Sequence, residues 1–279
     1  MTISKDQADK AARFAALHQD GCFILPNAWD MASAALIADA GFAALATTSS
    51  GVAFANGLPD GERIGRDRML AVAGEIARRL PIPVTADLEA GYGPEPEDVA
   101  ITVRAAIAAG VVGCNIEDTD PRTRALFDFD LSVARIKAGA AAARQAGLAD
   151  FVLNARADPF LTGFGDAEAC LTEAARRANA YLEVGALSTF APGPSDLDVV
   201  RRLAAAVHGP LNIMAVAAGG APPLETLKPL GVRRISLGGS LMATAYDAAS
   251  RRLAVLAGHE GDPEPVTHAR LTRLMTRYV

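Results

Sequence analysis

The segments Val84-Thr85-Ala86-Asp87, Asn115-Ile116-Glu117-Asp118 and Asn154-Ala155-Arg156-Ala157-Asp158 each close a short apolar run with polar or charged side chains. The same rhythm occurs eight times along the chain, and an alanine-rich helical stretch follows each run. This alternation predicts an α/β fold, a closed (β/α)8 barrel of the TIM type, in which the carboxyl ends of all strands face one mouth. Carboxylates and an arginine from distant parts of the sequence are then expected to meet in one pocket.

The expected strands are near-continuous apolar runs, as is typical of parallel strands covered by helices. They lie near residues 23–27, 43–48, 82–87, 112–117, 151–156, 187–191, 211–215 and 233–238. The alternative is a doubly wound open sheet, which binds its ligand where the strand order reverses. No glycine-rich dinucleotide fingerprint follows the first strand, where Pro26-Asn27-Ala28-Trp29-Asp30 stands instead. Eight strand–helix units favour the closed barrel.

The composition bounds the location and the partners. A chain of 279 residues that is 51% hydrophobic is long enough for one large core. Its net charge of −5 and the lack of a basic run argue against nucleic-acid binding. We find no apolar stretch long enough to span a membrane and no signal-peptide core near the first residues. The three scattered cysteines form no metal or disulfide pattern, so we expect a cytoplasmic protein without a membrane partner.

The ends of the chain differ from the repeating middle. We expect one barrel domain over residues 1–257, with a first helix near 5–19 that covers the barrel bottom or packs on its side. Residues 258–279 form a tail that contains Gly261, Pro263 and Pro265 before a stretch with helical spacing. This tail either packs on the barrel or reaches a partner subunit.

Acidic side chains gather at the predicted mouth. Asp87 and Glu117 end adjacent strands, and Asp60 follows the second strand. Several carboxylates in one mouth repel one another unless a cation joins them, and a hard cation such as Mg²⁺ prefers oxygen ligands. Each of these acids, considered alone, could also be a helix cap or a surface ion-pair partner. The pair at adjacent strand ends favours a metal site.

Other polar residues at the strand ends suit an anionic substrate. Arg156 ends the fifth strand, where an arginine binds carboxylate or phosphate, although it could instead pair with Asp158 or Glu117. Thr47-Thr48-Ser49-Ser50-Gly51 offers donors to an anion or forms an ordinary turn. Asn212 could bind a substrate oxygen or only backbone. No histidine lies at a predicted strand end, so a Ser–His–Asp triad is not expected.

Taken together, the ordered segments resemble the isocitrate lyase/phosphoenolpyruvate mutase superfamily over roughly residues 20–240. The resemblance rests on the order and spacing of these segments: Leu25–Ala34, Ser49-Ser50-Gly51, Gly57-Leu58-Pro59-Asp60, Thr85-Ala86-Asp87, Gly91-Tyr92-Gly93, Asn115–Asp118 and Asn154–Asp158. It implies a (β/α)8 barrel whose last helix is exchanged between subunits, in a homo-oligomer that is a dimer or, as is usual in this family, a tetramer.

The resemblance also implies a ligand set. It implies a Mg²⁺ site, with Mn²⁺ as an alternative, formed by Asp87, Glu117 and Asp60, and a small 2-oxo or 2-hydroxy carboxylate as substrate. The candidate residues for substrate binding are Ser49, Ser50, Gly51, Asp87, Arg156 and Asn212. Of these, the resemblance implies Ser50, Gly51 and Arg156. The candidate residues for catalysis are Asp60, Arg156 and Ser50.

Three departures from the family pattern bear on the reaction. Thr85 stands where we expect the first of two metal-binding acids separated by one residue, and Glu89-Ala90 reads as an insertion. The stretch Thr119–Asp130 lacks the Cys, His and Lys of the lyase loop. Phe190-Ala191-Pro192-Gly193 offers no glutamate after the sixth strand.

These departures favour a reaction that needs no base for a substrate hydroxyl group. We therefore expect a Mg²⁺-dependent carbon–carbon lyase that acts through a metal-stabilised enolate, with decarboxylation of an oxaloacetate-like acid favoured. One alternative is hydrolysis of a C–C or C–P bond, as in oxaloacetate or phosphonopyruvate. Two further alternatives are methylisocitrate-lyase-like cleavage at low activity and a 2-oxo-acid-binding protein with little turnover.

Overall fold

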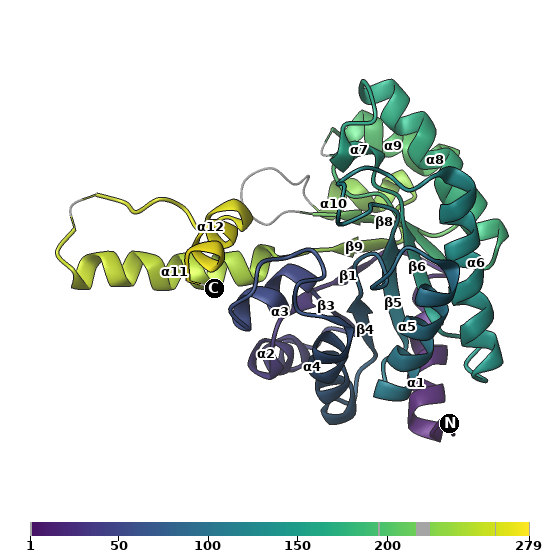
Figure 1. The fold of residues 1–279 in the computed structure, drawn as a ribbon, viewed down its shortest axis with the longest axis horizontal. Helices are drawn as coiled ribbons and strands as arrows, with labels where there is room; N and C mark the ends of the chain where they lie inside the picture. The colour runs from purple at the N-terminus through teal and green to yellow at the C-terminus, as the bar shows by residue number, and fades with distance from the viewer. Residues whose placement is uncertain (1, 195, 216–223, 260, 279) are drawn as a thin grey trace.

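Nine parallel strands form the centre of the molecule in the computed structural model, which describes residues 2–194, 196–215, 224–259 and 261–278. Helices alternate with the strands and surround them (Figure 1). The strands are β1 (Phe23–Leu25), β2 (Asn27–Ala28), β3 (Leu45–Thr47), β4 (Val84–Asp87), β5 (Gly113–Glu117), β6 (Val152–Arg156), β7 (Ser188–Phe190), β8 (Leu211–Met214) and β9 (Arg234–Ser236). This arrangement confirms the predicted (β/α)8 barrel.

Proline at position 26 explains why nine strands make an eight-stranded barrel. Proline has no N–H to donate to the ladder, so the predicted first strand is divided into β1 and β2. β1 pairs with β9 and β2 pairs with β3, so the two halves occupy the two edges of the sheet. Because the chain runs directly from one half to the other, the barrel closes there. The open doubly wound sheet is therefore wrong.

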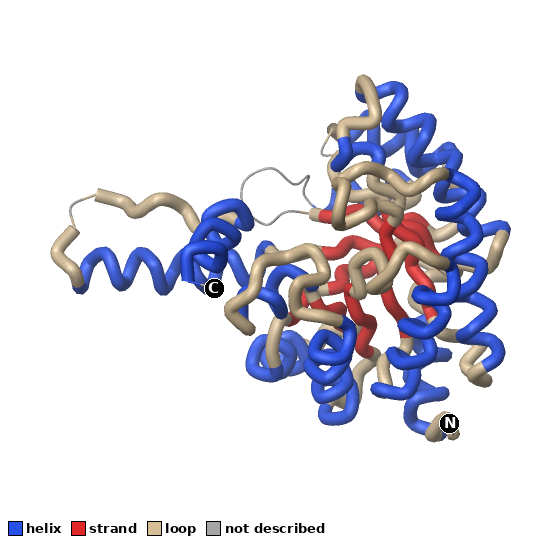
Figure 2. The backbone as a smooth tube through the Cα atoms, in the orientation of Figure 1, coloured by secondary structure: helices blue, strands red, loops and turns tan. Residues whose placement is uncertain are grey.

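The helices cover the outside of the barrel, as Figure 2 shows. Those in the repeating part are α2 (Met31–Asp39), α3 (Ser49–Ala55), α4 (Arg66–Arg79), α5 (Pro96–Ala109), α6 (Phe129–Gln145), α7 (Pro159–Thr162), α8 (Ala167–Glu183), α9 (Leu197–Ala206), α10 (Leu224–Leu227), the 3₁₀ turn η1 (Lys228–Leu230) and α11 (Ser240–Leu256). The short helices α3 and α7 were not predicted, because seven and four residues are too few to show a helical period.

The first helix, α1 (Lys5–Ala16), closes the amino-terminal end of the barrel. Phe14 is fully buried and lies below Gly113, the first residue of β5. The Gln7 amide donates to the carbonyl oxygens of Ile107 and Val111 at 2.8 and 3.2 Å, respectively. The barrel therefore has a sealed bottom, and the opposite end is left for a ligand.

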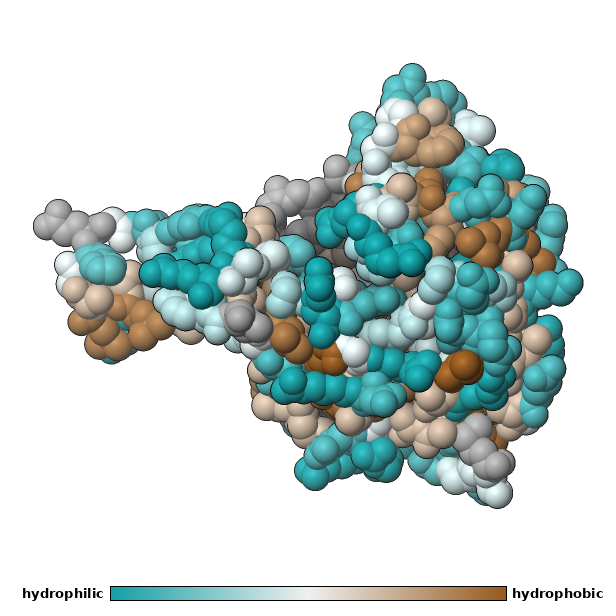
Figure 3. Space-filling model, in the orientation of Figure 1, coloured by the Kyte–Doolittle hydropathy of each residue, from teal (hydrophilic) through white to brown (hydrophobic). Residues whose placement is uncertain are grey.

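The C-terminal part leaves the barrel and returns to it. α11 projects from the body of the protein, and α12 (His268–Tyr278) lies back along it (Figure 1). Leu271 of α12 packs with Phe54 of α3 and Met242 of α11 in a small apolar cluster. Leu253, Val255 and Leu256, near the end of α11, remain exposed. Figure 3 shows brown, hydrophobic atoms on this projection.

Among the described helices, none has the length and apolar character needed to cross a membrane.

Candidate active site

Asp87, Glu117 and Arg156 lie at the carboxyl ends of three neighbouring strands. Asp87 is paired with Asn115 in the β4–β5 ladder, and Glu117 is paired with Arg156 in the β5–β6 ladder. Their side chains interact electrostatically, because Asp87 contributes to the pKa shifts of both Glu117 and Arg156. The three strand-end residues predicted from the sequence therefore share one end of the barrel.

Arg156 is held by two carboxylates. Its Nη1 lies 2.6 Å from Glu117 Oε2, and its Nε donates to Asp158 Oδ1 at 2.6 Å. Burial acts to lower the pKa of Arg156, but Asp158, Glu117 and Asp87 together raise it above its usual value. The guanidinium group is therefore a permanent cation with a fixed orientation, and both structural pairings considered from the sequence are present.

Glu89 is the main site residue that the sequence interpretation missed. It is 5% exposed, and burial, Asp60 and Asp87 raise its pKa well above the usual range. The sequence interpretation gave Glu89 no role in the site, whereas the structure brings its carboxylate near those of Asp60 and Asp87. The two acids separated by one residue are thus Asp87 and Glu89, and Thr85 lies further down the strand. The spacing Asp87-Leu88-Glu89 was the available signal.

The loops around Glu89 are locked to each other. Glu62, Glu89 and Tyr92 all adopt positive φ angles of 51–63°, which non-glycine residues rarely do. The Glu62 N–H donates to Glu89 Oε2 at 2.6 Å, and the Tyr92 N–H donates to Glu62 Oε1 at 2.7 Å. Arg135 of α6 donates to the carbonyl oxygens of Ala90 and Gly93. Backbone strain of this kind persists where the surroundings enforce it, and it clusters at functional sites.

Asp60 contacts a residue from the opposite end of the chain. His268 Nε2 of α12 lies 3.2 Å from Asp60 Oδ2, and the His268 ring packs on Phe54 with centroids 5.3 Å apart. No histidine was expected near the mouth, because His268 belongs to the tail and no local pattern connects it to residue 60. His18, in contrast, is buried at the barrel bottom, where burial and Arg234 lower its pKa to about 4.

The predicted anion-binding segment forms the first turn of α3. The Ser49 N–H donates to Asp87 Oδ2 at 3.2 Å, and the Ser50 hydroxyl group lies 3.2 Å from that of Thr48. Gly51 is required for packing, because a Cβ atom there would lie 2.6 Å from Thr48 Cγ2 and 2.8 Å from Trp29 Cβ. The segment thus lies beside Asp87 as expected, with one of its N–H groups already bonded to that carboxylate.

Asn212 occupies a different place from the other candidates. It lies within β8 and is fully buried, and its Nδ2 donates to the Ser236 hydroxyl group at 3.2 Å. Its Oδ1 has no hydrogen-bond partner. The alternative of a purely backbone partner is not what the structure shows, and contact with a substrate stays a prediction.

The carboxylates fit a divalent cation that keeps several water ligands. One oxygen each of Asp60, Asp87 and Glu89 is buried without a hydrogen-bond partner, which is costly for an anion. Within the part of the chain that the structure describes, no three His, Cys, Asp or Glu side chains are close enough to bind a metal together. Mg²⁺ is commonly bound by one or two carboxylates and by water, so this donor set suits it. Asp87 and Glu89 are the first candidates, because they have free oxygens and are not ion-paired to an arginine.

Comparisons with known proteins agree with the barrel fold. The family model for phosphoenolpyruvate phosphomutase matches residues 14–257, which include all nine strands. A protein of unassigned function from Mycobacterium tuberculosis is 34% identical over 262 residues, covering 94% of this chain and 95% of that relative.

Solved structures show the same architecture. A candidate phosphonomutase from Burkholderia cenocepacia has a TM-score of 0.82 at 42% identity, covering 90% of this chain and 99% of that one. Oxaloacetate acetylhydrolase in complex with its product oxalate has a TM-score of 0.79 at 28% identity, covering 96% of this chain and 94% of that one.

Proposed function

Because the chain belongs to the phosphoenolpyruvate phosphomutase family, in a superfamily of carbon–carbon lyases and mutases, we propose that it is a Mg²⁺-dependent lyase of a small 2-oxo carboxylate. The favoured reaction is decarboxylation of an oxaloacetate-like acid. In that reaction the bond to the leaving carboxylate breaks, CO₂ departs, and the electron pair remains on the substrate as an enolate, which then takes a proton from water.

One observation supports this proposal above all. Carboxylate oxygens without a hydrogen-bond partner and an arginine of fixed orientation lie at the same end of the barrel. The free oxygens of Asp60, Asp87 and Glu89 are suited to a cation, and Arg156 is suited to a carboxylate. The hairpin of residues 119–127 contains no Cys, His or Lys to act as the acid or base of a hydroxy-acid lyase. Decarboxylation requires no such group on this hairpin.

The chain's own residues bind and orient the substrate. Arg156, fixed by Glu117 and Asp158, would bind the substrate's C1 carboxylate and hold the scissile bond in one orientation. A divalent cation held by Asp87 and Glu89 would supply Lewis-acid stabilisation of the charge that develops on the 2-oxo oxygen. Ser50 is 8% exposed and follows Ser49, whose N–H donates to Asp87. Its hydroxyl group would add a hydrogen bond to the same 2-oxo oxygen.

Incubation of the purified protein with oxaloacetate and Mg²⁺ tests this function. We expect pyruvate and CO₂ to form faster than in the protein-free control, which matters because Mg²⁺ alone decarboxylates this acid. Asp87→Ala and Glu89→Gln should each reduce the rate by about 100-fold or more, since removal of one stabilising group from a charged site has effects of this order. Equal CO₂ release from the wild type and Asp87→Ala would sink the proposal.

Hydrolysis is the second candidate, and the similarity to oxaloacetate acetylhydrolase favours it. The unpartnered oxygen of Asp60 would accept a proton from an attacking water molecule. The same incubation separates the two reactions, because hydrolysis of oxaloacetate gives acetate and oxalate instead of pyruvate and CO₂. Ligand-induced thermal stabilisation without either set of products would indicate a binding protein.

A further inference from the structure

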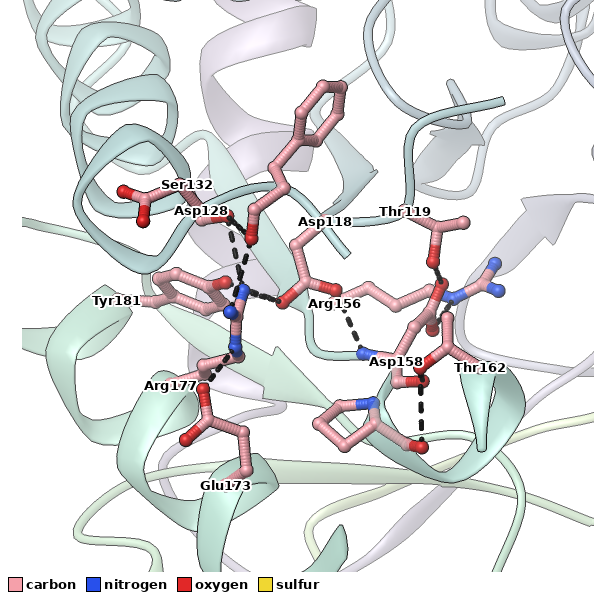
Figure 4. Close-up of polar contacts among 12 residues, drawn as sticks. Asp118, Thr119, Asp128, Ser132, Arg156, Asp158, Thr162, Glu173, Arg177 and Tyr181 are labelled. Carbon is pink, nitrogen blue, oxygen red and sulfur yellow. Dashed lines mark hydrogen bonds and ion pairs between the residues drawn. The ribbon is translucent and has the colours of Figure 1, made fainter. Parts of the chain in front are cut away.

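A chain of buried polar contacts leads from Arg156 into the outer helix layer (Figure 4). Asp158 is 1% exposed and accepts a hydrogen bond from Arg156 Nε at 2.6 Å. Its other oxygen, Oδ2, accepts from the Thr119 hydroxyl group at 2.8 Å. The carboxylate that orients Arg156 is therefore itself oriented by the first residue of the hairpin 119–127.

Asp118 continues the chain of contacts. Its Oδ1 accepts the backbone N–H of Asp158 at 2.9 Å. Its Oδ2 accepts from the Tyr181 hydroxyl group at 2.6 Å and from Arg177 Nη1 at 3.1 Å. Asp118, Arg177 and Tyr181 are 3%, 4% and 0% exposed, so water does not compete for these bonds. Two residues of α8 thus hold the carboxylate that holds Asp158.

The same residues hold the far end of the hairpin. The Phe127 N–H donates to the Asp118 carbonyl oxygen at 2.8 Å, and Arg177 Nη2 donates to the Phe127 carbonyl oxygen at 3.1 Å. Thr119 and Leu126 form an antiparallel bridge between the two arms. Both arms of the hairpin therefore rest on Asp118 and Arg177.

Because this network is buried, the loss of any one of its members is costly. Arg177 is the cation that contacts Asp118, and removal of one member of a buried pair leaves an uncompensated charge. Hydrogen bonds in a buried network also fix one another's geometry. A substitution on α8 should therefore change the positions of both the Arg156 guanidinium group and the hairpin, which form the two ends of the network.

We propose that Arg177 and Tyr181 are positioning residues of the active site. Through Asp118 and Asp158 they fix the carboxylate-binding Arg156 and the hairpin 119–127 relative to each other. A substitution at either residue should therefore displace Arg156 and the hairpin together. This inference rests on the proposed function only in assigning substrate binding to Arg156.

Tyr181→Phe and Arg177→Met test the proposal, with Arg176→Met as the matched control. Arg176 is the neighbouring residue and also pairs with Glu173, but Asp118 is bonded by Arg177 and not by Arg176. Tyr181→Phe removes one buried hydrogen bond and keeps the ring, so it remains informative if Arg177→Met does not fold.

The first readouts need no substrate. Phenylglyoxal modifies accessible arginines, and peptide mass spectrometry measures its rate at Arg156. Trypsin cleaves after Arg122 and Arg124, which lie on the exposed part of the hairpin. We expect both rates to rise by about 5-fold or more in Tyr181→Phe and further in Arg177→Met, since one buried hydrogen bond to a charge changes an equilibrium by roughly tenfold. Arg176→Met should match the wild type.

The functional readout is oxalate binding in the presence of Mg²⁺. We expect the dissociation constant to rise by about 5-fold in Tyr181→Phe, and KM for oxaloacetate to rise more than kcat falls, because a misplaced Arg156 weakens binding of the ground state as well. If the hairpin is cleaved faster while Arg156 reactivity is unchanged, the coupling is refuted. If the wild type turns over no 2-oxo acid but Arg156 and the hairpin both respond, the proposed function fails and the positioning role stands.

Discussion

The protonation state of the buried Glu89 carboxylate links metal binding to the stability of the protein. Burial, Asp60 and Asp87 raise its pKa well above the ordinary value of 4.5. Without metal, the folded protein therefore binds this proton more tightly than the unfolded chain does. The free energy of unfolding then decreases as the pH rises from about 4.5 through the folded-state pKa, by up to about 1.4 kcal/mol per pH unit.

We therefore predict that Glu89→Gln flattens this pH dependence and makes the metal-free protein more stable above neutral pH. The same substitution should reduce the stabilisation that Mg²⁺ gives, because it removes a charged oxygen from the site. Urea unfolding at several pH values, with and without Mg²⁺, measures both effects. Glu97→Gln, on the exposed side of α5, is the control and should behave as the wild type. Parallel pH curves for Glu89→Gln and the wild type would contradict the role assigned to Glu89.

The residues whose place in the structure the sequence predicted correctly are those whose position follows from the barrel itself. Asp87, Glu117 and Arg156 end strands, and parallel strands of a closed barrel must present their carboxyl ends together. Glu89 was missed because it lies two residues beyond its strand, where a positive φ turns the loop back into the site. His268 was missed because only the tertiary packing of the tail brings it to Asp60.

Gly51 gives a prediction about close packing at the same scale. A Cβ atom at this position would overlap both Thr48 and Trp29, and Thr48 is itself buried. Gly51→Ala should destabilise the protein by about 1–3 kcal/mol, as overpacking of a filled core does, although alanine is the better helix former. Thermal unfolding measures this. Ser49 in the same turn is buried and bonded to Asp87, so alanine there is unsuitable as a control. Ala55→Gly, at the exposed end of α3, serves to measure helix propensity alone.

Helix α12 shows that an element can be predicted while its role is not. The spacing of residues 267–278 predicted a helix, and the structure has one from His268 to Tyr278. Its contacts with α3 and with Asp60 depend on where the chain returns after α11, which no local pattern specifies. The short helices α3 and α7 were likewise absent from the prediction because their stability comes from tertiary packing rather than from a periodic apolar face.

The contact between α12 and the mouth leads to a prediction about activity. His268→Ala removes the hydrogen bond to Asp60 Oδ2, which leaves that carboxylate freer to move. Because His268 is 58% exposed, the effect should be modest, a decrease in kcat/KM of about 2–5-fold. Steady-state kinetics with oxaloacetate measures it, and His259→Ala, elsewhere in the tail, is the control. Equal kinetics for both variants would separate α12 from the active site.

For the whole molecule, the projection of α11 points to an assembly that the single chain does not complete. Leu253, Val255 and Leu256 are 64–67% exposed within one turn of this helix, far from the barrel core. Exposed apolar patches of this kind are typical of interaction sites. We therefore predict that the protein forms a homo-oligomer in which this part of α11 packs on a second copy, as the resemblance to helix-exchanging relatives led us to expect.

A pair of charge-introducing variants tests that assembly. Leu253→Asp together with Leu256→Asp should convert the oligomer into smaller species, because burying two unpaired carboxylates in an apolar interface costs several kcal/mol. Leu36→Asp, at a 71% exposed leucine on α2, introduces the same chemistry elsewhere and should leave the assembly intact. Sedimentation velocity at several concentrations distinguishes the species. A wild type that sediments as a monomer at every concentration would show that the exposed end of α11 does not pack on a second copy.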